Sequence, residues 1–316
     1  MKNMVLFKNC FLFTLILFIT FSGISVNAES EIPEIETEPL YVSDNSFYFG
    51  VFTAETKNEA KNGIFQNVTD ETVFYASIQN SGKDRCITLK GYLNYESVPL
   101  HILDSKYDQE KISVKDGTNI VIPFKIDAEI RPSANYKFLI SMFIGVDLHE
   151  SDTNFGTTMY GTSYDYFIQN QPENIVDLDL ISEKPLHYIP FSPDRMAFMI
   201  NTDFSADTDI IKVPPAELTL KRGEEFSLAY RIGNAYPKAK SCLLLVTMDY
   251  QQASINNADY LCIDTRDNYI SYGEIKLTAP DQEGKYEICA LLVPDPKTPV
   301  PFVPLEYSRR FTLTVT

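Results

Sequence analysis

The chain has 316 residues and lacks most of the residue patterns that mark an enzyme. It has no tryptophan, three histidines (His101, His149 and His187), and five cysteines without a C-x-x-C pair. No H-E-x-x-H, G-x-S-x-G or G-x-x-x-x-G-K-[ST] motif is present. Zinc-protease, nucleophile-elbow and phosphate-loop chemistry therefore have no sequence support. A catalytic group assembled from distant loops would leave no such motif, so a hydrolase on a β-scaffold stays a third hypothesis.

Positive charge is also scarce. The sequence holds 27 Lys+Arg against 43 Asp+Glu, for a formal net charge of -16. Nucleic-acid binding and docking on anionic membranes both need clustered Lys and Arg, so neither partner is expected.

The first 28 residues have the pattern of an export signal. Lys2 and Lys8 precede an apolar run, and Ala28 ends a stretch of small residues. A basic end, an apolar run and a small-residue cleavage site are typical of a secretory signal peptide. We predict cleavage after Ala28 and a secreted protein with no membrane span in its mature form; an uncleaved anchor is the alternative. Residues 29–38, with five glutamates, are expected to form a disordered acidic leader.

Beyond the leader, the periodicity is that of strands. Short aromatic and β-branched runs recur between turn signals such as Asn80-Ser81-Gly82 and Arg131-Pro132-Ser133. No window carries convincing helical spacing with caps at both ends. The pattern predicts an all-β protein made of sandwiches or barrels.

Four segments of the first half recur in the second half in the same order. They pair residues 43–49 with 193–199, 73–78 with 226–232, 86–89 with 242–245, and 135–140 with 285–290. Four ordered matches indicate an internal duplication. We therefore predict two domains, 39–172 and 173–316; a single jelly-roll-like double sheet is the alternative architecture.

The segment Gly284-Lys285-Tyr286-Glu287-Ile288 has the Gly-x-Tyr-x-apolar form that introduces a late strand in Ig-like sandwiches. Together with residues 226–230 and the following Asn turn, it resembles the tandem Ig-like modules of bacterial secreted and cell-surface proteins. The resemblance implies two tandem antiparallel Ig-like β-sandwiches, with a tyrosine hydroxyl bonded back to the corner before its strand. There is no core Trp and no Cys two residues after the tyrosine, so antibody-type details are not expected.

The mature chain retains four cysteines, and export permits disulfides. Cys242 and Cys289 could bridge the core if they lie on facing strands of opposite sheets. The alternative is that all four cysteines are buried as small apolar residues.

Two further candidate sites come from acidic and aromatic residues. Asp203, Asp207 and Asp209 could hold Ca²⁺, a hard ion that takes oxygen ligands, as could Asp147, Glu150 and Asp152 in another loop. Neither loop fits a known calcium pattern, so no cofactor is expected. Tyr164 and Tyr166 share one strand face and are candidates for a ligand platform.

These features give two main hypotheses of function. The first is a non-catalytic interaction or structural module at a bacterial cell surface, with a protein or glycan partner. The second is a carbohydrate-binding protein that uses exposed tyrosines or loop-bound Ca²⁺.

Overall fold

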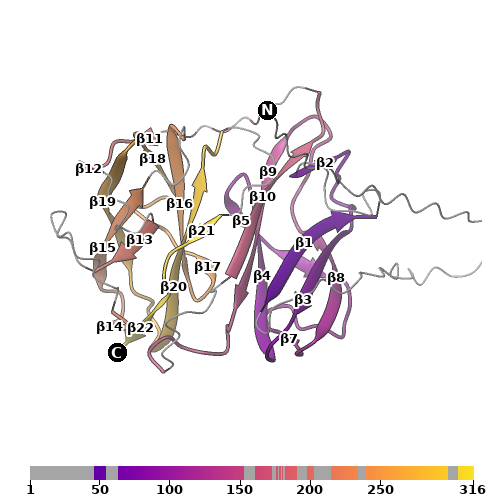
Figure 1. Cartoon of the computed structure of the whole chain (residues 1–316), viewed down its shortest axis with the longest axis horizontal. Coiled ribbons are helices and arrows are strands. Elements are labelled where there is room, and N and C mark those ends of the chain that lie inside the picture. The colour runs from indigo at the N-terminus through magenta and orange to yellow at the C-terminus, as the bar shows by residue number, and fades with distance from the viewer. Residues whose placement is uncertain are drawn as a thin grey trace, which may run out of the picture. The chain divides into compact units, whose positions relative to one another are not determined.

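The protein is represented by a computed structural model. The structure describes residues 46–54, 63–152, 161–172, 176, 178, 180, 182–190, 198–202, 215–233, 239–297 and 305–316. The predicted signal peptide (1–28) and leader (29–38) lie outside these residues. The described residues form strands and no α-helix (Figure 1), which confirms the all-β prediction. None of them belongs to a helix long and apolar enough to cross a membrane.

Two sheets are built from the first half of the chain. Sheet 1 has the order β1 (Phe47–Thr53), β3 (Phe74–Asn80), β8 (Thr118–Ile126), β6 (Leu100–Ile102). Sheet 2 has the order β2 (Ile64–Gln66), β10 (Gly161–Gln169), β9 (Tyr136–Ile144), β4 (Arg85–Leu93), β5 (Glu96–Val98), and β7 (Ile112–Val114) also pairs with β4. All pairs are antiparallel except β2 with β10.

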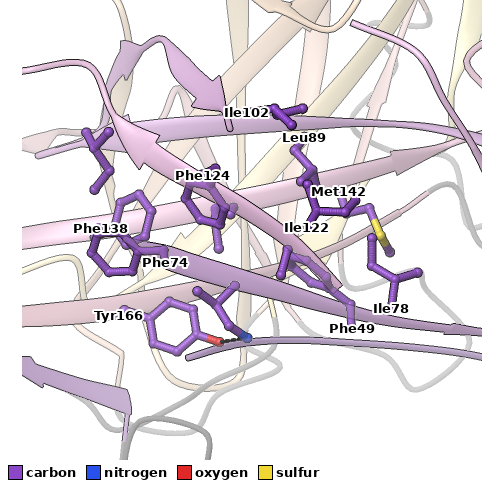
Figure 2. Packing of buried hydrophobic residues seen from close by; sticks show 14 of the residues in the cluster. Phe49, Phe74, Ile78, Leu89, Ile102, Ile122, Phe124, Phe138, Met142 and Tyr166 are labelled. Atoms are coloured by element: carbon purple, nitrogen blue, oxygen red, sulfur yellow. Dashed lines mark hydrogen bonds between the residues drawn. The ribbon is translucent and has the colours of Figure 1, made fainter. Parts of the chain in front are cut away.

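The inner faces of these sheets enclose the first core (Figure 2). Strand β3 alternates buried and half-buried residues, so Phe74, Ala76 and Ile78 point inward. Phe74 packs against Phe124 from sheet 1 and Phe138 from sheet 2, with ring centroids 5.6 and 5.3 Å away. These contacts join the two sheets into one sandwich.

Two more sheets are built from the second half. Sheet 3 has the order β11 (Ser182–Glu183), β18 (Leu261–Asp264), β16 (Ser241–Met248), β20 (Gly284–Pro294), β22 (Phe311–Val315), β14 (Glu217–Leu220), with β17 (Gln251–Gln252) on β16 and β21 (Glu306–Tyr307) on β20. Sheet 4 has the order β12 (His187–Pro190), β19 (Tyr269–Thr278), β15 (Glu225–Gly233), β13 (Phe198–Asn201). A second core lies between them, and it includes Leu228, Ile275, Leu244 and Phe311.

The two sandwiches repeat one strand order. The series β1-β3-β8 corresponds to β13-β15-β19, and β2-β10-β9-β4 corresponds to β14-β22-β20-β16. Even the unusual parallel pair recurs, as β2 with β10 and as β14 with β22. Three of the four segment pairs matched by sequence fall on equivalent strands: β3/β15, β4/β16 and β9/β20. The fourth includes the starts of β1 and β13.

Two separate cores exclude the single double sheet. The domain bounds 39–172 and 173–316 stay a prediction, because residues 42–316 cluster as one compact unit.

Sheets 2 and 3 are also buried on their outer faces. Residues from both sandwiches form a shared cluster, here called the inter-sandwich core: Tyr92, Tyr95, Leu139, Phe143, Leu180, Leu243, Leu245, Tyr250, Cys262, Leu291, Val293 and Leu305. Strands β9, β16 and β20 are therefore buried on both faces over most of their length. Such strands have continuous apolar sequences instead of an alternating pattern.

Each sandwich contains the tyrosine corner that the Ig-like resemblance implies. In the first, the Arg131 backbone N–H donates to the Tyr136 hydroxyl at 2.9 Å. In the second, the Tyr286 hydroxyl donates to the Gln282 carbonyl at 3.0 Å. Both tyrosines lie at the start of the strand that occupies the same place in its sheet. This feature confirms the fold-level resemblance.

Replacing Tyr286 with Phe removes only the hydroxyl of this corner. We expect the free energy of unfolding to fall by about 1 kcal/mol, the usual net value of one hydrogen bond. Urea denaturation measures this change. Tyr75→Phe is the matched control, because the half-buried Tyr75 ring stacks on Phe52 and is not part of a corner. Equal losses in both variants would contradict a special role for the corner.

Candidate functional site

Of the two acidic loops considered for Ca²⁺ binding, only the one with Asp147, Glu150 and Asp152 lies among the described residues. Asp203, Asp207 and Asp209 lie outside the described residues. In the other loop, Glu150 pairs with Arg309 at 3.4 Å and Asp152 pairs with Lys285 at 2.5 Å. Among the described residues, no three His, Cys, Asp or Glu side chains form a metal-binding group.

The predicted tyrosine platform is wrong. Tyr166 is 1 % exposed, and its hydroxyl accepts a hydrogen bond from the Val51 backbone N–H at 3.3 Å (Figure 2). Tyr164 is half-buried and stacks on Phe49 at 5.8 Å. The period-two spacing correctly placed both tyrosines on one face of β10. That face is turned to the first core and not to solvent.

The candidate disulfide is also wrong. Cys242 and Cys289 lie on β16 and β20, which are neighbours in the same sheet. Cys289 is opposite Thr247, five residues along the strand from Cys242. That offset is about 16 Å at about 3.3 Å per residue, whereas a disulfide needs Cα atoms within about 7 Å. Cys242, Cys262 and Cys289 are buried free thiols, and burial raises the pKa of Cys289 to about 12.

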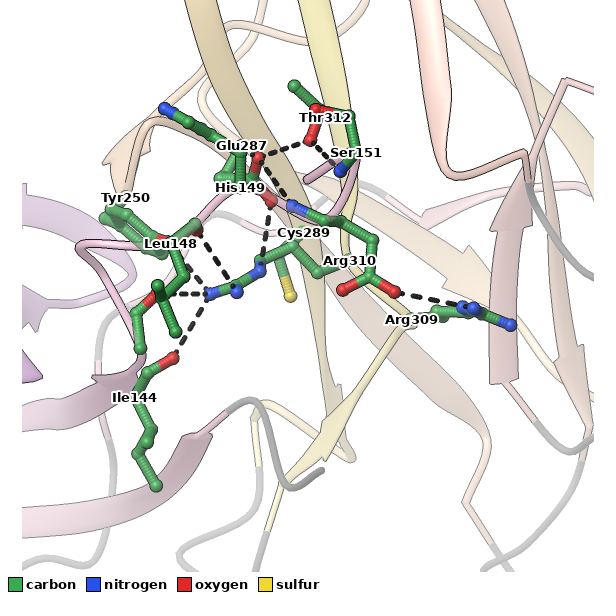
Figure 3. A network of polar contacts seen from close by, with 12 residues as sticks. Ile144, Leu148, His149, Ser151, Tyr250, Glu287, Cys289, Arg309, Arg310 and Thr312 are labelled. Atoms are coloured by element: carbon green, nitrogen blue, oxygen red, sulfur yellow. Dashed lines mark hydrogen bonds and ion pairs between the residues drawn. The ribbon is translucent and has the colours of Figure 1, made fainter. Parts of the chain in front are cut away.

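A buried ionic network that sequence reasoning missed joins the two sandwiches (Figure 3). Arg310 is 1 % exposed, and its Nε lies 3.0 Å from Glu287 Oε2. Arg310 Nη1 donates to the Ile144 carbonyl at 3.1 Å and to the Tyr250 hydroxyl at 2.9 Å. Arg310 Nη2 donates to the Leu148 carbonyl at 3.4 Å. One guanidinium from the second sandwich thus holds the loop that follows β9 in the first.

The second carboxylate oxygen of Glu287, Oε1, holds the same loop after β9. Glu287 Oε1 accepts hydrogen bonds from the Thr312 hydroxyl at 2.6 Å and from the Glu150 backbone N–H at 3.3 Å. His149 Nδ1 lies 3.2 Å from the same oxygen. Glu150 itself is buried, and desolvation raises the pKa of its carboxyl group against the opposing effect of Arg309. Buried polar groups of this kind need every partner in place, which favours a single arrangement of the loop.

A second buried pair lies at the repeat-related position of the first sandwich. Lys137 Nζ is 2.6 Å from Asp165 Oδ2, and both side chains are less than 10 % exposed. The Tyr95 hydroxyl is 3.1 Å from Asp165 Oδ2 and 3.1 Å from the carbonyl oxygen of Pro296 in the second sandwich. Its single proton is shared between these acceptors. Burial, more than any other cause, raises the pKa of the Asp165 carboxyl group.

Two hairpin turns position the tyrosines of these networks. Asn94-Tyr95 and Asp249-Tyr250 join β4 to β5 and β16 to β17, and all four residues have positive φ. Positive φ at a tyrosine is costly, so the surrounding packing must stabilise it. Both tyrosine rings lie in the inter-sandwich core, where that packing is found.

An open cleft of about 630 Å³ lies beside the β16–β17 hairpin of the second sandwich. Its apolar lining comes from Met248, Ala253, Leu277, Pro280 and Tyr286. Its polar lining comes from Glu225, Asp249, Gln251, Gln252, Ser254, Asn256, Asn257, Lys276 and Thr278. A volume of this size falls in the range of about 300–1,000 Å³ for small-molecule sites.

Hydrogen bonds to strand β19 and to the first sandwich hold the cleft wall that contains Gln252 and Asn256. Asn256 and Asn257 have φ of 52° and 63°. The Asn256 backbone N–H donates to the Lys276 carbonyl at 3.1 Å, and the Lys276 N–H donates to Asn256 Oδ1 at 2.9 Å. Gln252 Oε1 accepts from the Ser97 N–H of the first sandwich at 2.7 Å. The wall is therefore preformed.

No family model matches the chain, and no curated protein matches it. Solved structures are similar to the chain over most of its length, and three of them serve as examples. One is the chaperone–tip adhesion subunit complex of Acinetobacter baumannii Csu pili, with 9% identity, coverage of 85% of this chain and 99% of that chain, and a TM-score of 0.25.

Another comprises fibronectin(III)-like modules of Clostridium thermocellum CbhA, with 10% identity, coverage of 84% and 92%, and a TM-score of 0.21. A third is the C-terminal domain of the Streptococcus pyogenes antigen I/II-family protein AspA, with 8% identity, coverage of 86% and 100%, and a TM-score of 0.21. Scores this low carry no argument about function. The Ig-like assignment rests on the strand order and the tyrosine corners.

Proposed function

We propose that the chain is a non-catalytic interaction module that acts outside the cell, with its two sandwiches serving as one rigid scaffold for a binding surface. The observation that carries this proposal is the inter-sandwich core together with the Arg310–Glu287 network. Tandem domains in one chain usually move relative to each other unless their interface is large and apolar. Here an apolar layer and buried ion pairs support a fixed geometry.

A fixed scaffold suits recognition, because binding loops lose less entropy when rigid elements already hold them in position. The export pattern of residues 1–28 supports a site of action outside the cell. The acidic composition supports a protein or glycan partner over a nucleic acid.

Carbohydrate binding is a second candidate function, and the preformed cleft of the second sandwich favours it. The cleft combines one tyrosine, apolar contacts and several amide side chains. Tyrosine offers an apolar ring with a polar tip, which suits a wet binding site.

The proposal is tested with the full chain, isolated cell envelopes and a broad panel of hydrolase substrates. We expect saturable binding to the envelopes and no turnover of any substrate. Turnover that survives repurification would make the protein an enzyme and overturn the proposal. Failure to bind envelopes or any of their extracted proteins and glycans would also overturn it.

A further inference from the structure

We infer that the cleft beside the β16–β17 hairpin binds a short neutral oligosaccharide. This inference rests on the proposed function, which it deepens by naming a ligand class and a site. The candidate residues are Gln251 and Asn257 as hydrogen-bonding groups and Tyr286 as an apolar face.

Two amides at the rim are available for a ligand. The side chains of Gln251 and Asn257 are exposed and bond no other described residue. Gln252, in contrast, is committed, because its Nε2 donates to the carbonyls of Tyr95 and Asp259, each at 2.9 Å. An amide both donates and accepts hydrogen bonds, so one side chain can pair with two adjacent sugar hydroxyls.

Tyr286 presents a fixed ring to the cleft. Its hydroxyl is held by the Gln282 carbonyl at 3.0 Å, which fixes the ring at the start of β20. Met248 lies on the same cleft lining and adds a second apolar contact. Sugar rings have an apolar C–H face and a polar edge, and a lining of one tyrosine with several amides matches both.

Charge argues against anionic ligands. Glu225 and Asp249 line the cleft and are opposed by Lys276 alone. An anionic ligand would meet more negative than positive charge at this rim, and phosphate recognition would need clustered cations. A neutral ligand meets no such penalty.

Backbone pairing argues against a peptide that would add a strand here. Strand addition needs free N–H and C=O groups on a sheet edge. At this edge of β19, both backbone groups of Lys276 are bonded to Asn256. The loop thus covers the edge at Lys276 and leaves side chains as the recognition groups there.

The test uses the full chain on an array of neutral, amino and acidic oligosaccharides, followed by calorimetric titration of the neutral sugars that bind. In the variant Gln251→Ala/Asn257→Gly, glycine keeps the backbone free to hold φ near 63° while the amide is lost. We expect at least tenfold weaker binding, which corresponds to about 1.4 kcal/mol. Gln66→Ala, which removes an exposed amide on β2, should change affinity less than twofold.

Hydrogen exchange locates the site without relying on the variants. Bound sugar should slow exchange in residues 251–257 and leave residues 64–66 unchanged. No neutral sugar bound on the array or in solution, or binding that the double variant leaves intact, would overturn the inference. Envelope binding without sugar binding removes only this inference, whereas hydrolysis of a bound sugar removes the proposed function.

Discussion

Replacing Arg310 with Met should lower the free energy of unfolding by about 3–5 kcal/mol, the usual cost of removing one partner from a buried ion pair. Methionine replaces the aliphatic part of the side chain but leaves the buried Glu287 carboxylate without its guanidinium partner. It also leaves the carbonyls of Ile144 and Leu148 without their donor. Urea denaturation of the full chain measures the loss, and hydrogen exchange should rise in residues 145–152, where the loop is released.

The matched control removes both charges. Arg310→Met/Glu287→Leu should regain part of the lost stability, because an apolar pair carries no uncompensated charge. Exchange in residues 145–152 should stay raised in the double variant, since the loop anchors remain absent. A loss below about 1 kcal/mol in the single variant would show that water reaches Glu287 and that the network does not fix the interface.

The fold could be predicted because its signals are local. Turn residues, strand-type periodicity and four ordered repeats indicate a duplicated all-β chain, and one Gly-x-Tyr-x-apolar segment indicates the corner of an Ig-like strand. The structure places three of the repeated segment pairs on equivalent strands, with the same parallel pairing in each sandwich.

The inter-sandwich core could not be predicted in the same way, although it left a signal. Residues 138–144, 242–248 and 288–293 are nearly continuous apolar runs. Such runs indicate strands buried on both faces, which an isolated two-sheet sandwich does not contain. Their partners lie about 100 to 150 residues away along the chain, so local periodicity identifies the buried strands but not what covers them.

The candidate site depends on the same kind of distant contact. The spacing of Tyr164 and Tyr166 would be the same whether their strand face met solvent or the core. Only the packing of Phe49 and Phe65 against their rings shows that this face is buried. The pairing of Arg310 with Glu287 likewise needs the register of β20 against β22. Charged residues within apolar runs are the signal that could have pointed to it, since such residues are seldom fully buried without a partner.

The repeat explains why the networks come in two copies. Tyr95 and Tyr250 occupy equivalent hairpin turns, and the backbone N–H of the preceding Asn94 and Asp249 donates to the carbonyls of Lys137 and Glu287, both at 2.8 Å. The two halves thus meet through equivalent faces, as the subunits of a symmetric dimer do. The two buried ion pairs, Lys137–Asp165 and Glu287–Arg310, have their charges exchanged, because Lys137 lies at the position that Glu287 has in the other half.

This difference gives the last prediction. Replacing Lys137 with Met should lower the free energy of unfolding by about 3–5 kcal/mol near neutral pH, because Asp165 loses its buried partner. The deficit relative to the parent protein should shrink as pH falls from neutral toward the ordinary pKa of an aspartate, about 3.9. Lys137 lowers the pKa of Asp165, whereas burial raises it, so the variant has a higher Asp165 pKa in the folded state. A folded state that holds a proton more tightly than the unfolded state gains stability as pH falls through the folded pKa.

Denaturation at several pH values measures this slope, and Lys137→Met/Asp165→Asn provides the control. Asparagine keeps the shape of Asp165 and cannot titrate. The loss in free energy of unfolding of the double variant, relative to the parent protein, should therefore not shrink in the same way as pH falls. An equal deficit at both ends of the pH range in the single variant would mean that packing around the lysine stem, and not the uncompensated carboxylate, accounts for the loss. The Tyr95 hydroxyl would then be expected to hold the charge of Asp165 by itself, since it already lies 3.1 Å from Oδ2.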